Sequence, residues 1–434
     1  MEKLFQLKKH NTNVRTEVIG GLTTFFAMAY IIFVNPNFLS QTGMDHTAVM
    51  LATCVSAAIG CFLTAFMANV PFAQAPGMGL NAFFTYTICF GMGYTWQQGL
   101  AIVFISGLIF LAISVSPIRK QIIDSIPAPL KAAISAGIGL FICLIGLLNA
   151  GIVTAGNNLL DLSSITSGPA LLALIGLIIT GILMAWKVKG ALFIGILVTT
   201  VIGIPMGVTN LSNVSISFEG ISIAPTFFKL SFVGLLSKGI LPLLTAIVTF
   251  AMCDCFDTVG TLIGTAGSAG MLDENGNLPR GDKALIADAV ATCTGALMGT
   301  STVTTFVESS TGISEGARTG LSSVVVGILF LLGCVLAPIA GIIPSAATAP
   351  ALIIVGMFMI GNVAKIDWSD VEVALPCFLT IAMMPFAYSI SDGIGFGFIS
   401  YTLIKMARGK FKEVPVLLYI LSALFVVMYI LAAL

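Results

Sequence analysis

The chain has 434 residues, of which 57% are hydrophobic and 9% charged, whereas soluble domains carry about 25% charged residues. This composition leaves too little polar surface for a water-soluble body, so it excludes a soluble enzyme and predicts a polytopic protein of the lipid bilayer. Lys and Arg (19) balance Asp and Glu (19), which excludes a nucleic-acid-binding surface. The nine Cys residues lie in apolar stretches, so we expect packed thiols and neither a metal nor a cofactor.

Apolar runs long enough to cross a membrane as helices fall into two sets of seven. The first set covers residues 17–40, 48–69, 72–93, 95–116, 128–150, 168–187 and 190–208. After a more polar stretch, 209–236, the second set covers residues 237–265, 282–300, 303–317, 318–340, 346–363, 371–388 and 389–408. The sequence therefore predicts an all-α fold of about 14 transmembrane helices. A further run, 414–433, either spans the membrane, lies in its interface or completes the last helix.

The basic residues predict the orientation, because Lys and Arg accumulate in cytoplasmic loops. With a cytoplasmic N-terminus, alternate crossings put every Lys and Arg except Lys229 and Lys238 on the inner side. We expect the first run to be retained, since it is too long for the core of a signal peptide. Short loops and the lack of a targeting extension indicate a cell membrane of the bacterial inner-membrane type.

The two sets of runs are expected to be inverted repeats, because seven crossings reverse the direction of the chain. Residues 72–77 (FAQAPG) are similar to residues 306–311 (FVESST), and Ile-Pro stands before both the fifth and the twelfth run, at 126–127 and 343–344. Inverted repeats with segments interrupted by Gly or Pro are typical of secondary transporters. We therefore expect short broken helices at the third and tenth spans.

Ionisable residues inside spans are energetically unfavourable and therefore mark candidate functional sites. Asp254 and Asp257 stand three residues apart in the eighth run, on one helix face. Glu308 lies in the tenth run. The alternative for all three is a polar helix end beside an aqueous loop or the interface.

Other features of the runs have more ordinary interpretations. Asp288 and Asp392 either support a site or face a solvated cavity. Glu315 and Arg318 stand three residues apart, which predicts an ion pair at the cytoplasmic edge. Residues 137–139 (GIG) indicate close helix packing instead of phosphate binding.

The candidate site has the chemistry of a receptor for a neutral, polar, planar molecule. Small residues after Gln74 and Glu308 predict broken helices, whose free backbone N–H groups point into a cavity. Carboxylates supply acceptors beside these donors, and no basic residue stands within these segments to bind a strong anion. A low dielectric favours the protonated form of a carboxyl group, so Asp254, Asp257 or Glu308 is a candidate proton carrier.

Eight short stretches follow one another from the first run to the eleventh: 20–31 (GGLTTFFAMAYI), 35–36 (NP), 74–84 (QAPGMGLNAFF), 256–261 (FDTVGT), 277–280 (NLPR), 299–305 (GTSTVTT), 308–309 (ES) and 316–321 (GARTGL). In this order they resemble the AzgA-like purine permeases, a branch of the nucleobase–cation symporter-2 superfamily. The resemblance implies fourteen spans in two inverted seven-helix repeats that form a core and a gate domain. The implied core halves are residues 1–127 and 237–345, and the gate halves are 128–236 and 346–434.

The resemblance also implies a function: import of hypoxanthine, guanine or adenine, with proton symport and an elevator-like motion of the core against the gate. In the wider superfamily, acidic or amide residues of the eighth and tenth spans hold the nucleobase, which by position implies Asp257 and Glu308 here. Thr261 stands where some members carry an ionisable group, so the proton carrier stays open among Asp254, Asp257 and Glu308. The oligomeric state also stays open, with a homodimer as one option.

The remaining candidate binding residues surround these carboxylates in the sequence. Gln74 and Ala75, at the opening of the third span, would close the site from the other repeat. Ser309 and Thr261 are small neighbours expected to select between bases. Phe25 and Phe306 are candidates for stacking on a ligand, with packing against lipid or core as the alternative.

Other classes of function make different demands. An anion carrier of the same seven-plus-seven architecture would favour a basic residue or bare helix ends at the site. An intramembrane enzyme would need metal ligands or a nucleophile–base pair, and the two histidines lie in the N-terminus and a loop. We therefore expect no catalytic residues. A channel would need a repeated filter or a symmetric pore.

Overall fold

The computed structural model describes residues 2–116, 125–156, 159–166, 168–211, 221–273 and 278–433. The helices of the first half are α1 (Glu2–Phe5), α2 (Val14–Met28), α3 (Ile31–Leu39), α4 (His46–Leu63), α5 (Met78–Ala82), α6 (Trp96–Val115), α8 (Ala128–Asn149), α9 (Gly168–Ala185) and α10 (Ala191–Gly203). Those of the second half are α11 (Ile240–Ser268), α12 (Gly281–Met298), α13 (Ser309–Ser314), α14 (Gly320–Gly333), α15 (Ala337–Ala340), α16 (Ser345–Ile360), α17 (Val371–Phe386), α18 (Ile390–Ala407) and α19 (Val416–Ala433).

Short segments of other backbone structure join or extend these helices. The 3-10 segments are η1 (Ser40–Thr42), η4 (Leu235–Lys238), η5 (Cys334–Leu336), η6 (Gly361–Lys365) and η7 (Phe411–Glu413), and the π-helical segments are η2 (Thr64–Ala68) and η3 (Phe83–Gly91). Two small antiparallel sheets among the described residues depart from the expected all-α fold. One pairs β1 (Gln74–Pro76) with β4 (Val303–Thr305), and the other pairs β2 (Val153–Gly156) with β3 (Leu159–Leu162).

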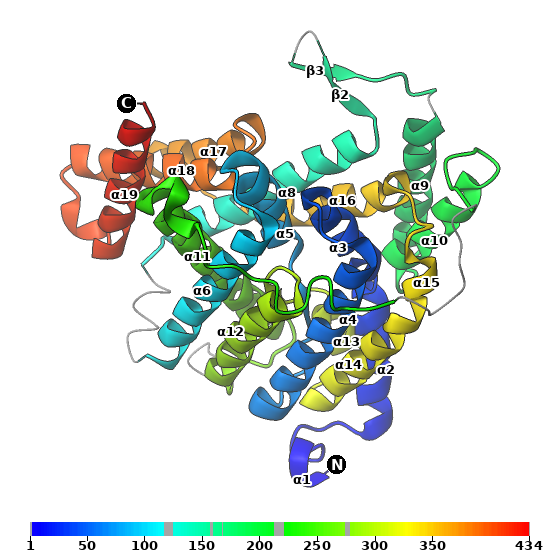
Figure 1. Cartoon of the computed structure of the whole chain (residues 1–434). Helices are drawn as coiled ribbons and strands as arrows, with labels where there is room; N and C mark the ends of the chain where they lie inside the picture. The colour runs from blue at the N-terminus through cyan, green and yellow to red at the C-terminus, as the bar shows by residue number, and fades with distance from the viewer. Residues whose placement is uncertain are drawn as a thin grey trace.

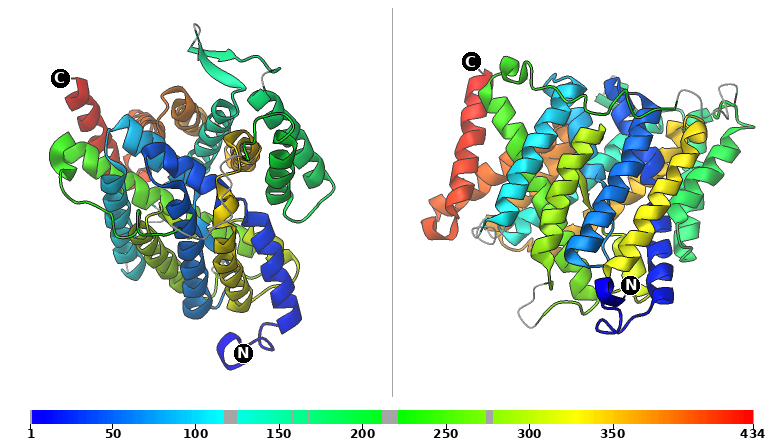
Figure 2. Two further views of the ribbon diagram at one scale, coloured as in Figure 1. Left: turned by 45° about the vertical axis from the view of Figure 1, so that its right-hand side comes forward. Right: turned by 60° about the horizontal axis from the view of Figure 1, so that its bottom comes forward.

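The helices form two bundles (Figure 1). In the first bundle, α2, α4, α6, α12 and α14 pack side by side, and α3, α11 and α13 contact them. In the second bundle, α8 packs on α16, α17 and α18, while α9 contacts α10 and α16. Both views of Figure 2 show elements of the two sequence halves interleaved within the bundles, as expected for intertwined repeats.

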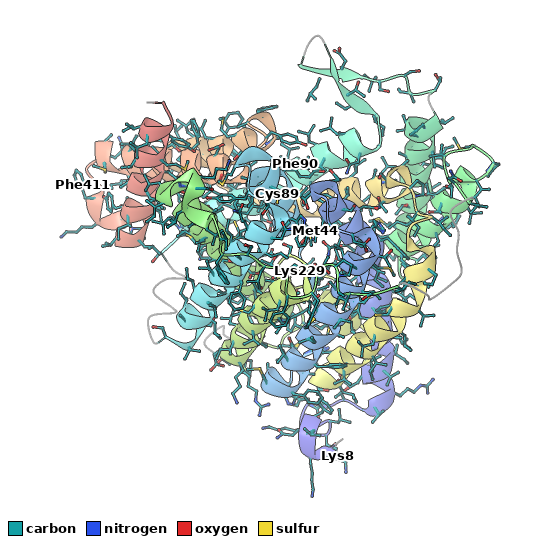
Figure 3. All side chains as sticks on the ribbon, in the orientation of Figure 1. Lys8, Met44, Cys89, Phe90, Lys229 and Phe411 are labelled. Atoms are coloured by element: carbon teal, nitrogen blue, oxygen red, sulfur yellow. The ribbon has the colours of Figure 1, made fainter. Side chains whose placement is uncertain are left out.

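The outer surface of the helices is apolar. Within the part of the chain that the structure describes, seven helical segments are long and apolar enough to cross a membrane: Val14–Thr42, His46–Ala68, Trp96–Val115, Ala128–Asn149, Gly168–Ala185, Ile240–Gly267 and Ser345–Lys365. Large apolar side chains such as Phe386 and Val416 are exposed on further helices. Such a surface is unsuited to water and suited to lipid. Charged side chains such as Lys8 extend from the ends of the molecule instead (Figure 3).

The third and tenth spans are broken, as the sequence predicts. β1 precedes α5 and η3 in the third span, and β4 precedes α13 in the tenth. The two strands pair antiparallel within the first bundle, with Ala75 opposite Thr304 at the centre of the three-residue register. The pairing satisfies backbone groups that no helix could satisfy at this depth. Two helix ends therefore meet at the middle of the bundle.

The predicted repeat matches residues 72–77 with residues 306–311. In the structure, β1 lies within the first of these segments, whereas β4 ends just before the second. The strand pairing places Gln74 opposite Thr305. The second match is confirmed, since Pro127 and Pro344 each stand at the N-cap of a long helix, α8 and α16.

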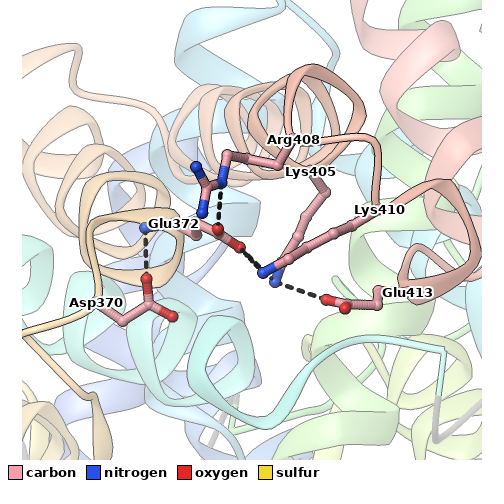
Figure 4. Close-up of polar contacts among 6 residues, drawn as sticks. All are labelled: Asp370, Glu372, Lys405, Arg408, Lys410 and Glu413. Atoms are coloured by element: carbon pink, nitrogen blue, oxygen red, sulfur yellow. Dashed lines mark hydrogen bonds and ion pairs between the residues drawn. The ribbon is translucent and has the colours of Figure 1, made fainter.

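The last apolar run forms a helix of its own, α19, which packs on α18 and α11. The link before it contributes to a cluster of charges (Figure 4). The Glu372 carboxylate accepts hydrogen bonds from Lys405, Arg408 and Lys410 at 2.7–3.0 Å, and Lys405 also binds Glu413 at 2.9 Å. This network joins the start of α17 to the end of α18 and to η7. Figure 1 shows α19 leaving it toward the side that carries the β2–β3 hairpin, away from α1.

The expected ion pair between Glu315 and Arg318 is wrong. Glu315 instead pairs with Lys189, with 2.8 Å between Nζ and Oε1. The Arg318 guanidinium donates to the backbone oxygens of Ile313 and Ala317, at 2.7 and 2.8 Å. The spacing in the sequence predicts that Arg318 binds Glu315. In the structure, Arg318 binds backbone carbonyl groups at and just after the end of α13 instead, because these groups have no partner within the helix.

Candidate functional site

A cavity of about 780 Å³ lies between the two bundles, bordered by α11, the break before α13, and α8 and α16. Its polar and charged lining residues from the first bundle are Tyr30, Asp257, Thr261, Thr265, Thr304, Thr305, Glu308 and Ser310. Those from the second bundle are Lys131, Ser135, Asn362 and Lys365. The acidic groups are therefore on one wall and the basic groups on the other. The volume is within the range of small-molecule sites.

The two carboxylates that the sequence singled out face this cavity. Asp257 extends from α11, and no hydrogen bond from a described residue reaches its carboxylate. Glu308 is the residue before α13, and its Oε1 accepts a hydrogen bond of 2.9 Å from the Tyr30 hydroxyl. The remaining oxygens are available to a ligand. This wall of the cavity can therefore accept several N–H hydrogen bonds.

Two further candidates line the same wall. Thr261 lies one turn after Asp257 on α11. Phe306 lies between β4 and α13, where its backbone N–H donates to the Ala73 oxygen at 3.0 Å. The Phe306 side chain is buried but forms part of the lining. An aromatic surface thus adjoins Glu308, which is compatible with stacking on a planar ligand.

Three other candidates lie behind the lining. Ser309 is buried, and its Oγ accepts a hydrogen bond of 3.0 Å from the Ala73 N–H. Ala75 is enclosed in the strand pair. The Gln74 side chain donates to Asp288 at 3.1 Å, away from the cavity. These residues connect the two broken spans to each other and do not form the cavity wall.

Asp288 is the centre of a buried polar network beneath the strand pair. Its carboxylate accepts hydrogen bonds from Gln74 (3.1 Å), Thr305 (2.8 Å) and Thr258 (2.8 Å). Thr258 also lies 2.8 Å from the Thr304 hydroxyl. Of the two interpretations of Asp288, the structure favours support of the site, because its donors come from β1, β4 and α11. The sequence around Asp288 does not distinguish support of the site from contact with a solvated cavity.

The remaining candidates are outside the cavity lining. Asp254 is buried and accepts a hydrogen bond of 2.7 Å from Thr292. Phe25 packs edge-to-face on Phe330, with ring centroids 5.2 Å apart. Asp392 accepts a hydrogen bond of 3.0 Å from Tyr429. Among the described residues, no group of three or more His, Cys, Asp or Glu side chains could hold a metal ion.

Sequence reasoning missed the opposite wall of the cavity. The Lys131 ammonium, on α8, lies 5.1 Å from the centre of the Phe256 ring. Ser135 accepts a hydrogen bond of 3.0 Å from the Asn362 amide. Lys365 ends the η6 segment that follows α16. Lys131 stands at the start of an apolar run, a position that indicates the cytoplasmic edge of the membrane. No local sequence pattern predicts that α8 and the end of α16, which are far apart in the chain, form one wall.

The cavity is closed at one end by contacts between the bundles. Asn37, after the proline of α3, donates to Thr348 near the start of α16 at 3.1 Å, and His46 lies 2.9 Å from the Asn37 oxygen. Nearby, the rings of Tyr86 and Phe141 lie 6.1 Å apart, and each contacts Tyr388. The cavity instead reaches the first turn of α8 and the η6 end of α16. These two ends are therefore not equivalent.

A family model described as "Permease family" matches residues 15–396. The chain belongs to this family. It is 46% identical to a permease of Methanocaldococcus jannaschii over 99% of this chain and 98% of that protein. It is 45% identical to the guanine/hypoxanthine permease PbuG of Bacillus subtilis (99% of each chain) and 41% identical to the adenine permease AdeP of Escherichia coli (98% and 95%).

Solved structures show the fold. The transmembrane domain of the cyanobacterial bicarbonate transporter BicA aligns with a TM-score of 0.68 at 17% identity, covering 88% of this chain and 97% of that one. The murine anion transporter Slc26a9 in its inward-facing state aligns with a TM-score of 0.67 at 10% identity, covering 91% and 68%. Apart from the two small sheets, the predicted helical architecture of two inverted seven-helix repeats is confirmed, as is the resemblance to the AzgA-like branch. The family member is a multi-pass membrane transporter and not an enzyme.

Proposed function

We propose that this permease imports purine nucleobases: hypoxanthine, guanine or adenine. The observation that carries the proposal is the pair of carboxylates, Asp257 and Glu308, on one wall of a cavity at a helix break. Neutral purines are planar and rich in N–H groups, which such acceptors bind. Relatives that match nearly the whole chain are named guanine/hypoxanthine and adenine permeases. Thr261 and Phe306 supply the neighbouring polar and aromatic contacts.

Proton symport is the second part of the proposal. A carboxyl group that alternates between solvent and a dry site can bind a proton on one side of the membrane and release it on the other. Asp257 and Glu308 remain the stronger candidates because both line the cavity. Asp254 is a further candidate, although it is buried outside the cavity lining, where it accepts a hydrogen bond from Thr292.

The proposed cycle moves a core domain (1–127 and 237–345) against a gate domain (128–236 and 346–434). Support comes from the cavity, whose acidic wall lies on the first bundle and whose basic wall lies on the second. The Asn37–Thr348 contact joins the two domains at the closed end. Alternating access would result if the bundles separated at the Asn37–Thr348 contact and came together at the η6 end of the cavity.

We place the protein in the cell membrane with its N-terminus in the cytoplasm, on the strength of the positive-inside pattern. In that orientation the present cavity faces the cytoplasm, since Lys131 and Lys365 belong to the basic side. A homodimer is compatible with the proposal and is not required by it, because both walls of the cavity come from one chain.

An anion carrier is the second candidate function. The observation in its favour is the presence of Lys131 and Lys365 in the cavity lining. Against it, the Lys131 ammonium lies over the Phe256 ring, and the opposite wall carries two carboxylates. Carboxylates repel a strong anion, whereas they accept hydrogen bonds from a neutral base.

Competition for uptake tests the proposal. Cells that lack their own purine permeases express the protein, and uptake of radiolabelled hypoxanthine is measured with unlabelled adenine, guanine, hypoxanthine, xanthine or uracil. We expect saturable uptake that one or more of the purines hypoxanthine, guanine and adenine block and uracil does not. Absence of saturable uptake, in protein shown to reach the membrane, would contradict the proposal. Uptake of labelled bicarbonate or sulfate instead would support the anion carrier.

A further inference from the structure

The contact between Tyr30 and Glu308 makes the two cavity carboxylates unequal. Tyr30 lies where α2 ends and α3 begins, and its side chain is 1% exposed although it lines the cavity. Its hydroxyl donates to Glu308 Oε1 at 2.9 Å. Asp257 receives no comparable hydrogen bond from a described residue. Glu308 is therefore held in one orientation by the protein, whereas Asp257 is not.

We propose that Tyr30 is a positioning residue that sets base selectivity by holding one oxygen of Glu308. This inference rests on the proposed function, because it concerns how the same site distinguishes purines. With Oε1 directed to the Tyr30 hydroxyl, Glu308 presents mainly Oε2 to the cavity and accepts one ligand N–H there. Selectivity then depends on a residue of the first span that does not itself need to touch the base.

The chemistry of the bases makes the consequence specific. Guanine carries two N–H donors side by side, on N1 and on the exocyclic N2, which suit both oxygens of one carboxylate. Hypoxanthine has the N1 donor but only a C–H group at position 2. A Glu308 held by Tyr30 gains little from the second donor of guanine. A Glu308 released from Tyr30 can turn both oxygens toward it, so loss of the hydroxyl favours guanine over hypoxanthine.

The site is built to hold this arrangement. Glu308 directly precedes α13, and its backbone oxygen accepts hydrogen bonds from the Thr311 N–H (3.0 Å) and hydroxyl (2.7 Å). The backbone at Glu308 is therefore fixed, and Tyr30 adds the constraint on the side chain. A fixed acceptor discriminates between ligands because a donor left without a partner loses about 1–3 kcal/mol, equivalent to roughly tenfold or more in affinity.

The test is the change in base preference caused by Tyr30→Phe, which removes the hydroxyl and keeps the ring. The inhibition constants of guanine and hypoxanthine are measured against labelled hypoxanthine uptake, together with KM and the maximal rate. We expect the preference for guanine relative to hypoxanthine to rise about tenfold, with a higher KM for hypoxanthine and a maximal rate within about twofold of the wild type.

Tyr86→Phe is the matched control. Tyr86 is also buried, and its hydroxyl donates to Gln41 at 2.9 Å, outside the cavity lining. We expect it to leave the preference unchanged. If Tyr30→Phe does not accumulate in the membrane, Tyr30→Met replaces it, since Met fills irregular buried space without a hydroxyl.

The outcomes separate this inference from the proposed function. Wild-type uptake with an unchanged preference in the Tyr30 variant would overturn the inference and leave the proposed function intact. An equal change in Tyr86→Phe would also overturn it, because the effect would not pass through Glu308. Absence of purine uptake by the wild type would overturn both.

Discussion

Gly139 and Gly356 bring α8 and α16 into backbone contact at the centre of the second bundle. A Cβ atom on Gly356 would lie 2.5 Å from the Gly139 oxygen, and one on Gly139 would lie 2.7 Å from the Gly356 oxygen. The separation in sequence between Gly139 and Gly356 is the same as that between Ile126 and Ile343, which stand just before α8 and α16. The crossing is therefore a point of internal symmetry. It also confirms that residues 137–139 serve close packing.

Gly356→Ala is expected to destabilise the protein, because its methyl group would overlap the backbone of α8. Overpacking of this kind costs about 1–3 kcal/mol. Thermal unfolding of the purified protein in detergent measures the effect, and we expect a melting temperature several degrees below that of the wild type. Gly361→Ala is the control, since a Cβ there would meet no atom within 4 Å. Equal melting temperatures for the two variants would refute the role of the crossing.

Asp288→Asn is expected to reduce both stability and uptake. The Asn side chain replaces one acceptor oxygen by a donor, so at least one of the three donors from Gln74, Thr258 and Thr305 loses its partner in the buried network. Each buried group left unpaired costs about 1–3 kcal/mol. Asp282→Asn makes the same change at an exposed position of the same helix. The account requires that only the buried variant melts at a lower temperature.

A covalent link between the bundles is expected to stop transport. Cysteines replacing Asn37 and Thr348 would join α3 to α16 at the closed end, where the native side chains lie 3.1 Å apart. After oxidation we expect at least a tenfold loss of uptake in the double variant, restored by a reductant, and little change in either single variant. The nine native thiols are buried or half-buried. Full transport by protein shown to be cross-linked would argue against motion between the bundles.

Proton coupling makes a prediction with a definite sign. If a proton enters with the base, an acidic exterior supplies protons on the uptake side and raises accumulation. In proteoliposomes, hypoxanthine uptake is expected to rise severalfold when the outside is one pH unit more acidic than the inside, and a protonophore is expected to remove the increase. Uptake independent of the imposed gradient would show a uniport or a different coupling ion.

The sequence predicted the elements of the fold because membrane spans and helix breaks have local signals. The small residues after Gln74 and Glu308 marked the two broken spans, and Pro127 and Pro344 marked the starts of α8 and α16. The pairing of the two broken spans was not predictable in the same way. Ala75 lies opposite Thr304, in a contact between segments far apart in the chain, and no local sequence signal marks such a contact.

The candidate site was predicted in part for the same reason. Asp257 and Glu308 were visible as charges in apolar runs, and both line the cavity. The groups that surround these carboxylates come from other elements: the Tyr30 hydroxyl of the first span binds Glu308, and the Lys131 side chain of α8 lines the opposite wall. Ser309 follows Glu308 directly and yet binds the Ala73 backbone. The sequence therefore identified the two carboxylates of the site, but not the residues from other helices that surround them.

Counterflow in proteoliposomes tests the central claim most directly. Vesicles that contain purified protein and unlabelled hypoxanthine are diluted into labelled hypoxanthine, and the accumulated label is compared among the wild type, Asp257→Asn, Glu308→Gln and Asp282→Asn. The account predicts accumulation by the wild type and by Asp282→Asn, and a loss of at least tenfold in both cavity variants at unchanged insertion and melting temperature. Wild-type accumulation by both Asp257→Asn and Glu308→Gln would contradict it.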